Sequence, residues 1–169
     1  MLAQDQFGNY VIQHILDKGK TKDKAFVISQ VKGNILQMSQ HKFASNVVEK
    51  CILNSNREDR AIIIEEIVTV RPDGIQPLLA MMKDQYANYV IQRMLDLLEP
   101  DQRDILIQKI KVHIPILSKF TYGKHIISKV ERFVGPGTLL SLSLIMILLG
   151  LISFILPFFR LCLVNDTSL

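Results

Sequence analysis

The stretch QDQFGNYVIQ at residues 4–13 recurs twice along the chain, as QHKFASNVVEK at 40–50 and as KDQYANYVIQ at 83–92. In each copy an aromatic residue precedes a small one, and an apolar segment follows. The aromatic residues are Phe7, Phe43 and Tyr86, which lie 36 and then 43 residues apart. Repeats of this length are typical of helical arrays, in which each unit buries its apolar face against its neighbours.

The apolar residues inside each copy have helical spacing. In the first copy Val11, Ile12, Ile15 and Leu16 form one stripe, and Gly19 is a helix stop. A second helix is predicted after each stripe, and no segment has the alternation of a strand. We therefore predict an all-α, right-handed α-solenoid. The predicted second helices span 22–32, the segment from Asn56 through 61–68, and 101–110, which follows Pro100. Breaks in the helical pattern are predicted at Gly33 and at Arg71–Gly74.

Three positions in each copy carry side chains suited to reading a nucleobase. Helix positions i and i+4 share a face and i+1 lies about a quarter-turn away. Asn9 and Gln13 could therefore meet the edge of a flat ring while Tyr10 lies against its face. The matching trios are Ser45, Asn46, Glu49 and Asn88, Tyr89, Gln92. A solvated polar patch at a helix start is the alternative for one copy, but three copies in phase favour base reading.

The chemistry of the trios differs between copies. Asn and Gln each offer an acceptor and a donor, which suits the mixed edge of uracil. An ionised Glu49 is acceptor-only, which suits the two adjacent N–H donors of guanine.

At these motifs the sequence resembles the Pumilio/PUF repeat family, which reads RNA one base per helical repeat. The resemblance covers residues 1–133, and the chain holds what look like the last three repeats of an eight-repeat domain. KFTYGKHIISKVERF at 119–133 resembles the half-repeat that closes the family's C-terminal end, and its Lys124, His125 and Ser128 do not form a base-reading trio. The implied organisation is repeats at 1–33, 34–76 and 77–112, with a cap at 113–133.

The resemblance implies a function. A chain of this kind is expected to bind single-stranded RNA in mRNA 3′-untranslated regions, in the cytoplasm, and to repress translation or promote decay through effector proteins. In the family the RNA runs antiparallel to the protein, so the three trios imply 5′-UGU-3′. The alternative from another class is a membrane-anchored helical scaffold that binds proteins, but a scaffold would not need polar trios in phase.

Catalytic and metal-binding residues are not grouped in this sequence. The four histidines have no ligand spacing, and adjacent Glu65 and Glu66 point in different directions on a helix. Gly135 and Gly137 precede an apolar run rather than following a strand, so they are not a phosphate loop. Cys51 and Cys162 do not indicate a disulfide framework. We expect no enzyme activity, no metal and no cofactor. The histidines are His14, His41, His113 and His125.

Composition separates residues 1–133 from a hydrophobic tail at 134–169. The tail carries only Arg160 and Asp166, so the net charge of +4 belongs to the repeats. Residues 139–159 are uncharged and long enough, as a helix, to cross a bilayer of about 30 Å. Three interpretations remain open: a transmembrane anchor with the repeats on the cytoplasmic side, an end that replaces the normal C-terminus through splicing or a gene-model artefact, or a helix packed on the last repeat.

Overall fold

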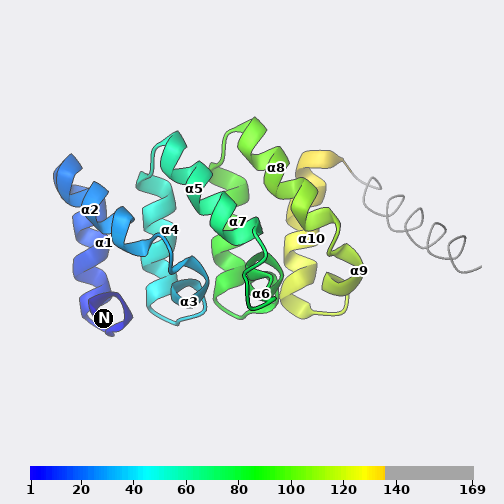
Figure 1. The fold of residues 1–169 in the computed structure, drawn as a ribbon, viewed down its shortest axis with the longest axis horizontal. Helices are drawn as coiled ribbons and strands as arrows, with labels where there is room; N and C mark the ends of the chain where they lie inside the picture. Colours follow the sequence, from blue (N-terminus) through cyan, green and yellow to red (C-terminus); the bar gives the residue numbers. More distant parts are fainter. Residues whose placement is uncertain (136–169) are drawn as a thin grey trace, which may run out of the picture. The chain divides into compact units, whose positions relative to one another are not determined.

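The fold is given by a computed structural model that describes residues 1–135. Within it, residues 1–130 form one compact unit. Within the described residues all regular structure is helical, which confirms the all-α prediction (Figure 1). The elements are η1 (Leu2–Gln4), α1 (Gly8–Lys18), α2 (Thr21–Val31), α3 (Ile35–Ser39), α4 (Ala44–Asn54), α5 (Arg57–Val68), α6 (Pro77–Lys83), α7 (Ala87–Leu97), α8 (Pro100–Lys111), α9 (Ile114–Leu117) and α10 (Thr121–Val134).

The proposed transmembrane segment at 139–159 lies outside the described residues. Among residues 1–135, no helix is both long enough and apolar enough to cross a membrane.

Residues 1–130 form repeats that each contribute a short helix and two long ones. α1, α4 and α7 lie side by side in one layer, and α2, α5 and α8 form a second layer, which lies in front of the first in the view of Figure 1. α1 packs on α4 and α4 packs on α7. Equivalent residues of successive repeats on α1, α4 and α7 therefore lie next to one another along one surface.

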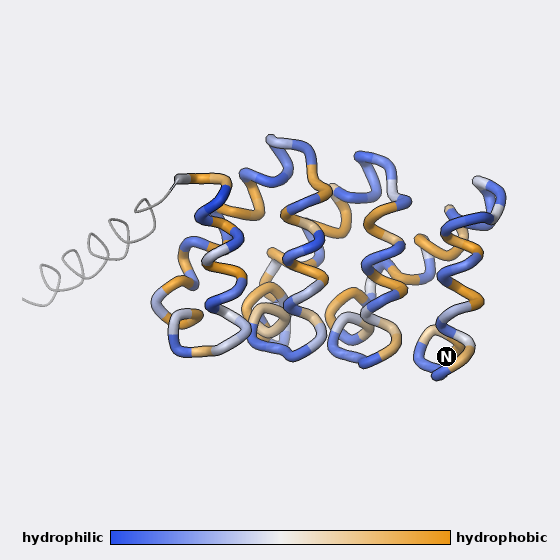
Figure 2. The backbone as a smooth tube through the Cα atoms, turned by 180° about the vertical axis from the view of Figure 1, so that it is seen from behind, coloured by the Kyte–Doolittle hydropathy of each residue, from blue (hydrophilic) through white to orange (hydrophobic). Residues whose placement is uncertain are grey.

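The apolar stripes predicted for α4 and α7 form the core between the layers, whereas of the stripe predicted for α1 only Leu16 is buried and Val11 is 54% exposed. Along each helix, hydrophobic residues alternate with hydrophilic ones (Figure 2). Burial of these side chains is the main source of stability in such an array. The larger apolar residues that are fully buried are Val47, Val48, Cys51 and Ile52 on α4, and Val90, Ile91, Met94 and Leu95 on α7.

The long helices of the first layer share one kind of N-terminal cap, two residues before the aromatic. The Asp84 carboxylate accepts from the backbone N–H groups of Tyr86 at 2.8 Å and Ala87 at 2.9 Å. Asp5 does the same before α1, and the Nδ1 atom of His41 does so before α4. These bonds satisfy helix N–H groups that have no partner inside the helix. Each of these helices therefore begins at the same position relative to the aromatic residue of its repeat.

The small residue after each aromatic lies against the preceding short helix. A Cβ atom on Gly8 would lie 2.7 Å from the backbone oxygen of Leu2, and one on Gly123 would lie 2.4 Å from that of Leu117. The equivalent Ala44 and Ala87 are completely buried. This close approach explains the aromatic–small pair in the repeat.

Several predicted boundaries are confirmed. Asn56 caps α5 by accepting from the Asp59 backbone N–H at 2.7 Å, and Pro100 begins α8. The predicted break at Arg71–Gly74 is a turn in which Gly74 has φ of +81° and donates to the Arg71 carbonyl at 2.9 Å. The short helices α3, α6 and α9 were not predicted.

Polar contacts in the second layer fix the register between repeats. The Glu66 carboxylate of α5 accepts from the backbone N–H groups of Gly33 at 2.7 Å and Ile35 at 2.8 Å. Lys32 forms an ion pair with Asp59. Arg57 on α5 binds Glu99 and Asp101 at the start of α8.

Candidate nucleic-acid interface

The nine residues singled out from the sequence lie on α1, α4 and α7. Within each trio the three positions have different exposure. The i positions are buried, since Asn9 and Asn88 are each 1% exposed and Ser45 is 5% exposed. The i+1 positions point outward: Tyr10 is 68% exposed, Tyr89 is 58% exposed, and Asn46 is also exposed. The i+4 residues, Gln13, Glu49 and Gln92, lie between these extremes.

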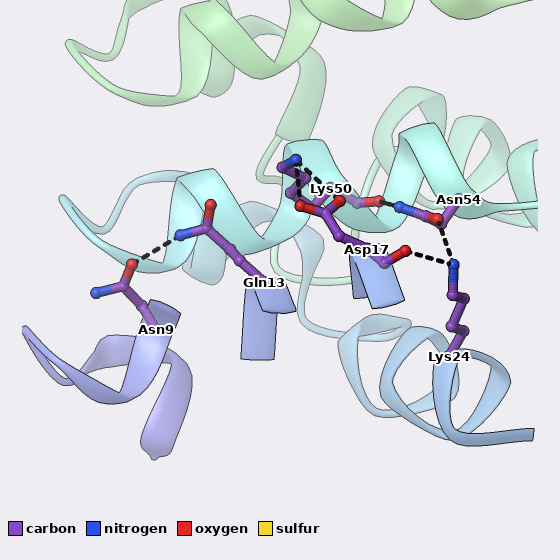
Figure 3. Close-up of polar contacts among 6 residues, drawn as sticks. All are labelled: Asn9, Gln13, Asp17, Lys24, Lys50 and Asn54. Carbon is purple, nitrogen blue, oxygen red and sulfur yellow. Dashed lines mark hydrogen bonds and ion pairs between the residues drawn. The ribbon is translucent and has the colours of Figure 1, made fainter. Parts of the chain in front are cut away.

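In the first trio the asparagine holds the glutamine. The Asn9 amide nitrogen donates to the backbone oxygens of Asp5 at 3.0 Å and Gln6 at 2.9 Å. The Gln13 amide nitrogen donates to Oδ1 of Asn9 at 2.8 Å (Figure 3). The donors of Asn9 are thus occupied by the protein, while Gln13 keeps one N–H and its oxygen for a ligand.

The third trio repeats this arrangement. Asn88 donates to the backbone oxygens of Asp84 at 2.8 Å and Gln85 at 3.1 Å. Gln92 donates to Oδ1 of Asn88 at 2.9 Å. The sequence predicted that the asparagine and the glutamine of a trio both contact the edge of the base. In the structure the buried asparagine supports the glutamine, and the glutamine is the more outward group. A donor beside an acceptor matches the N3–H and a carbonyl oxygen of uracil.

The middle trio has different electrostatics. The Ser45 hydroxyl donates weakly to the Lys42 carbonyl at 3.4 Å. The Glu49 carboxylate makes no hydrogen bond to any other described residue and is half-buried. Burial raises the pKa of Glu49, and the nearby positive charge of Arg93 opposes that rise. The Glu49 carboxylate is therefore partly desolvated, and its oxygens are available to accept hydrogen bonds from the N–H groups of a ligand.

Two adjoining grooves are lined by at least one residue of each trio. The larger groove, of about 520 Å³, lies between α4 and α7 and includes Glu49, Tyr89 and Gln92. The smaller groove, of about 110 Å³, extends from Glu49 toward Gln13 on α1. Asn46, Glu49 and Arg93 line both. A single strand with splayed bases could follow this surface from one helix to the next.

Sequence reasoning did not single out a basic position on the same helices. Lys50, Arg93 and Lys129 each stand seven residues after the aromatic of their repeat. Lys50 lines the smaller groove, Lys129 lines the larger, and Arg93 lines both. The signal that could have found them is the constant spacing from the aromatic. In the cap segment, Lys124, His125 and Ser128 are exposed on α10.

Other chemistry is not apparent in residues 1–135. No three His, Cys, Asp or Glu residues in this part of the chain are grouped so that they could hold a metal ion. Cys51 is buried, and burial raises the pKa of its thiol to about 12. That thiol therefore lacks the thiolate character of a nucleophile.

Comparison with known proteins agrees with this geometry. A family model described as "Pumilio-family RNA binding repeat" matches residues 1–32, 34–68 and 78–111. The chain is 47% identical over 137 residues to Pumilio homolog 1 of Arabidopsis thaliana, which covers 81% of this chain and 14% of that protein. It is 50% identical over 132 residues to the mRNA-binding protein puf3 of Schizosaccharomyces pombe, covering 78% of this chain and 18% of that protein.

Solved structures show the same fold. The crystal structure of PUF-8 in complex with PBE-RNA matches with a TM-score of 0.73 and 37% identity, over 79% of this chain and 38% of that one. The Puf3 RNA-binding domain bound to site B of the Cox17 RNA 3′ UTR recognition sequence matches with a TM-score of 0.67 and 29% identity, over 83% and 38% of the two chains. The chain thus spans less than a fifth of these curated relatives and under half of these solved structures.

Proposed function

The chain belongs to the Pumilio family of RNA-binding repeat proteins, and on this basis we propose that it binds single-stranded RNA along α1, α4 and α7. The family's proteins are RNA-binding repeats rather than enzymes. The observation that carries the proposal is the in-phase placement of three trios on successive helices, with the i+4 residue of each trio lining one of two grooves that share Asn46, Glu49 and Arg93. The solved structures of PUF-8 and Puf3 contain bound RNA.

The proposed sequence is 5′-UGU-3′. Gln92 on α7 reads the first uracil and Gln13 on α1 reads the second, because each presents one donor and one acceptor. Glu49 on α4 reads guanine by accepting from its N1–H and N2–H groups. The order assumes the antiparallel path that the family resemblance implies.

Stacking supplies the second element of binding. Tyr10 and Tyr89 expose their rings beside the edge-reading groups. Stacking of a base on an aromatic side chain tolerates any base and contributes roughly 1–3 kcal/mol. Asn46 lacks a ring and contributes less. Affinity therefore comes largely from the tyrosines, and sequence preference from the i+4 residues.

The wider role follows from the relatives. The Schizosaccharomyces pombe relative is described as an mRNA-binding protein, and the RNA in the Puf3 structure is a 3′ UTR recognition sequence. We propose that this chain acts in the cytoplasm on mRNA 3′-untranslated regions, and that repression or decay depends on effector proteins it recruits.

Direct titration tests the RNA-binding proposal. Labelled oligonucleotides with UGU or ACA in the same flanks, and a DNA version of the UGU sequence, are titrated with the full chain at one fixed low salt concentration, because phosphate contacts make affinity salt-dependent. We expect the UGU RNA to bind most tightly. Equal affinity for UGU and ACA would contradict sequence-specific reading.

A further inference from the structure

Ion pairs link α1 to α4 and α7 to α10, which are two of the three steps along the successive helices α1, α4, α7 and α10. Asp17 on α1 binds Lys50 on α4 with a shortest distance of 2.8 Å (Figure 3). Asp96 on α7 binds Lys129 on α10 at 2.6 Å. Each aspartate stands ten residues after the aromatic of its repeat, and each lysine stands seven after the next aromatic. The two lysines are thereby held against the preceding helix.

The interface between α4 and α7 lacks this pair. The position ten residues after Phe43 is Leu53, and the basic residue opposite is Arg93. Arg93 is exposed and has no ion pair or hydrogen bond to a described residue. Its side chain instead lines both grooves together with Glu49. The positive charge of Arg93 also acts on the Glu49 carboxylate and lowers its pKa against the effect of burial.

The replacement of aspartate by Leu53 thus leaves a guanidinium free beside the guanine-reading carboxylate. Building on the UGU proposal, we propose that Arg93 is a further specificity residue of this site and donates a hydrogen bond to O6 of the guanine held by Glu49. Guanine's edge places the acceptor O6 next to the donor N1–H. A site with Arg93 beside Glu49 presents the complementary donor and acceptors.

The same pair disfavours adenine. Adenine has an amino donor where guanine has O6, and an acceptor where guanine has N1–H. The fixed donors of Arg93 would face that amino group, and the Glu49 carboxylate would face that acceptor. Arginine donating to guanine O6 is the commonest base-specific contact of proteins with duplex DNA. Glu49 therefore sets the preference for guanine, and Arg93 strengthens it from the neighbouring repeat.

Leu53 provides a test that leaves Arg93 in place. Leu53→Asp restores the aspartate of the other two interfaces, so it should draw Arg93 into an ion pair of the Asp17–Lys50 type. Leu53 is 38% exposed, so a polar substitution is tolerable there. Leu53→Asn has the same shape without charge and is the matched control. Arg93→Gln removes the charge itself, on an exposed side chain, and remains informative if Leu53→Asp fails to fold.

The full chain and these three variants are titrated with UGU and UAU RNAs at two salt concentrations, after equal thermal midpoints are verified. Arg93→Gln and Leu53→Asp should each reduce the preference for UGU over UAU about tenfold, whereas Leu53→Asn should keep it. An unchanged preference in Arg93→Gln overturns the role of Arg93 while wild-type preference for UGU still supports the proposed function. Equal weakening of both RNAs with a shallower salt slope also overturns it, because that result marks a phosphate contact. Absence of any UGU preference in the wild-type chain overturns both proposals.

Discussion

Gln92 donates its side-chain amide to Oδ1 of Asn88 across 2.9 Å, and this bond determines which atoms of Gln92 remain for a ligand. Asn88 is itself fixed by two backbone carbonyls and is 1% exposed. Gln13 and Asn9 are related in the same way. The preference for uracil is therefore set by a buried residue as well as by the outward one.

Loss of the buried amide should affect stability. Asn88→Ala removes a buried amide that donates to the carbonyls of Asp84 and Gln85 and accepts from Gln92, and the loss of two or three such hydrogen bonds together costs about 1–3 kcal/mol. We expect the free energy of unfolding, measured by urea denaturation, to fall by that amount. Asn46→Ala, at the exposed neighbouring position on α4, should leave it nearly unchanged. Equal effects of the two substitutions would argue against a supporting role for Asn88.

The capping carboxylate before α7 should also contribute measurably. Asp84 accepts two backbone N–H groups at the helix start. Replacing a capping residue by alanine typically costs about 0.5–2 kcal/mol, so Asp84→Ala should lower the urea midpoint accordingly. The exposed Gln85→Ala is the control, because its side chain makes no such bond. A midpoint for Asp84→Ala that matches the control would exclude the capping role.

Tyr89 should contribute affinity without selectivity. Tyr89→Ala removes a stacking surface, and we expect it to weaken UGU and UAU RNAs by the same factor, corresponding to roughly 1–3 kcal/mol. Tyr89→Phe keeps the ring and should bind nearly as well as the wild type. Fluorescence anisotropy titration measures both. A change in base preference without loss of affinity would show that Tyr89 reads the base edge instead.

Acid should weaken binding of guanine-containing RNA through Glu49. Burial raises the pKa of this carboxyl above its ordinary value, although Arg93 opposes the shift. As pH falls through the raised pKa, an acceptor oxygen becomes an O–H donor facing the N–H groups of guanine. UGU affinity should therefore start to fall at a higher pH than an ordinary glutamate would give.

The Glu49→Gln variant, which cannot titrate, provides the control for this pH dependence. Its affinity should vary less with pH than that of the wild type, and identical profiles would exclude Glu49 as the titrating group. Protonation of Glu49 does not unfold the chain, so unfolding caused by this group does not explain the loss of binding. A carboxyl whose pKa is raised in the folded state favours the folded state as it is protonated.

The sequence predicted the array and its register because periodicity and capping signals are local. The stripe from Val90 to Leu95, the cap at Asn56 and the start at Pro100 all depend on neighbouring residues. The short helices α3, α6 and α9 have too few residues to show a period. The capping role of Asp84 is not evident from the sequence, because Asp84 stands two residues before Tyr86, the aromatic that marks the start of the helix in the repeat.

The different burial and roles of the i and i+4 residues within each trio could not be predicted from the sequence. Asn88 and Gln92 share a helix face, and only the folded structure shows that Asn88 is buried while Gln92 is partly exposed. The role of Arg93 is equally nonlocal, because it depends on comparing Leu53 with Asp17 and Asp96 in neighbouring repeats. The hydrophobic segment at 139–159 lies outside the described residues, so its three interpretations stay as predictions from the sequence.

The most direct test of the account is the base preference of Glu49→Gln. A glutamine at this position has one donor and one acceptor, so it no longer matches the paired N–H groups of guanine, and beside Ser45 it suits the edge of adenine. Titration of wild type and variant with UGU and UAU RNAs at fixed low salt should show that the wild type prefers UGU and the variant prefers UAU. The expected preference of the variant is about 1–3 kcal/mol. If the variant retains the wild-type preference for guanine, Glu49 does not read this base and the proposed register is wrong.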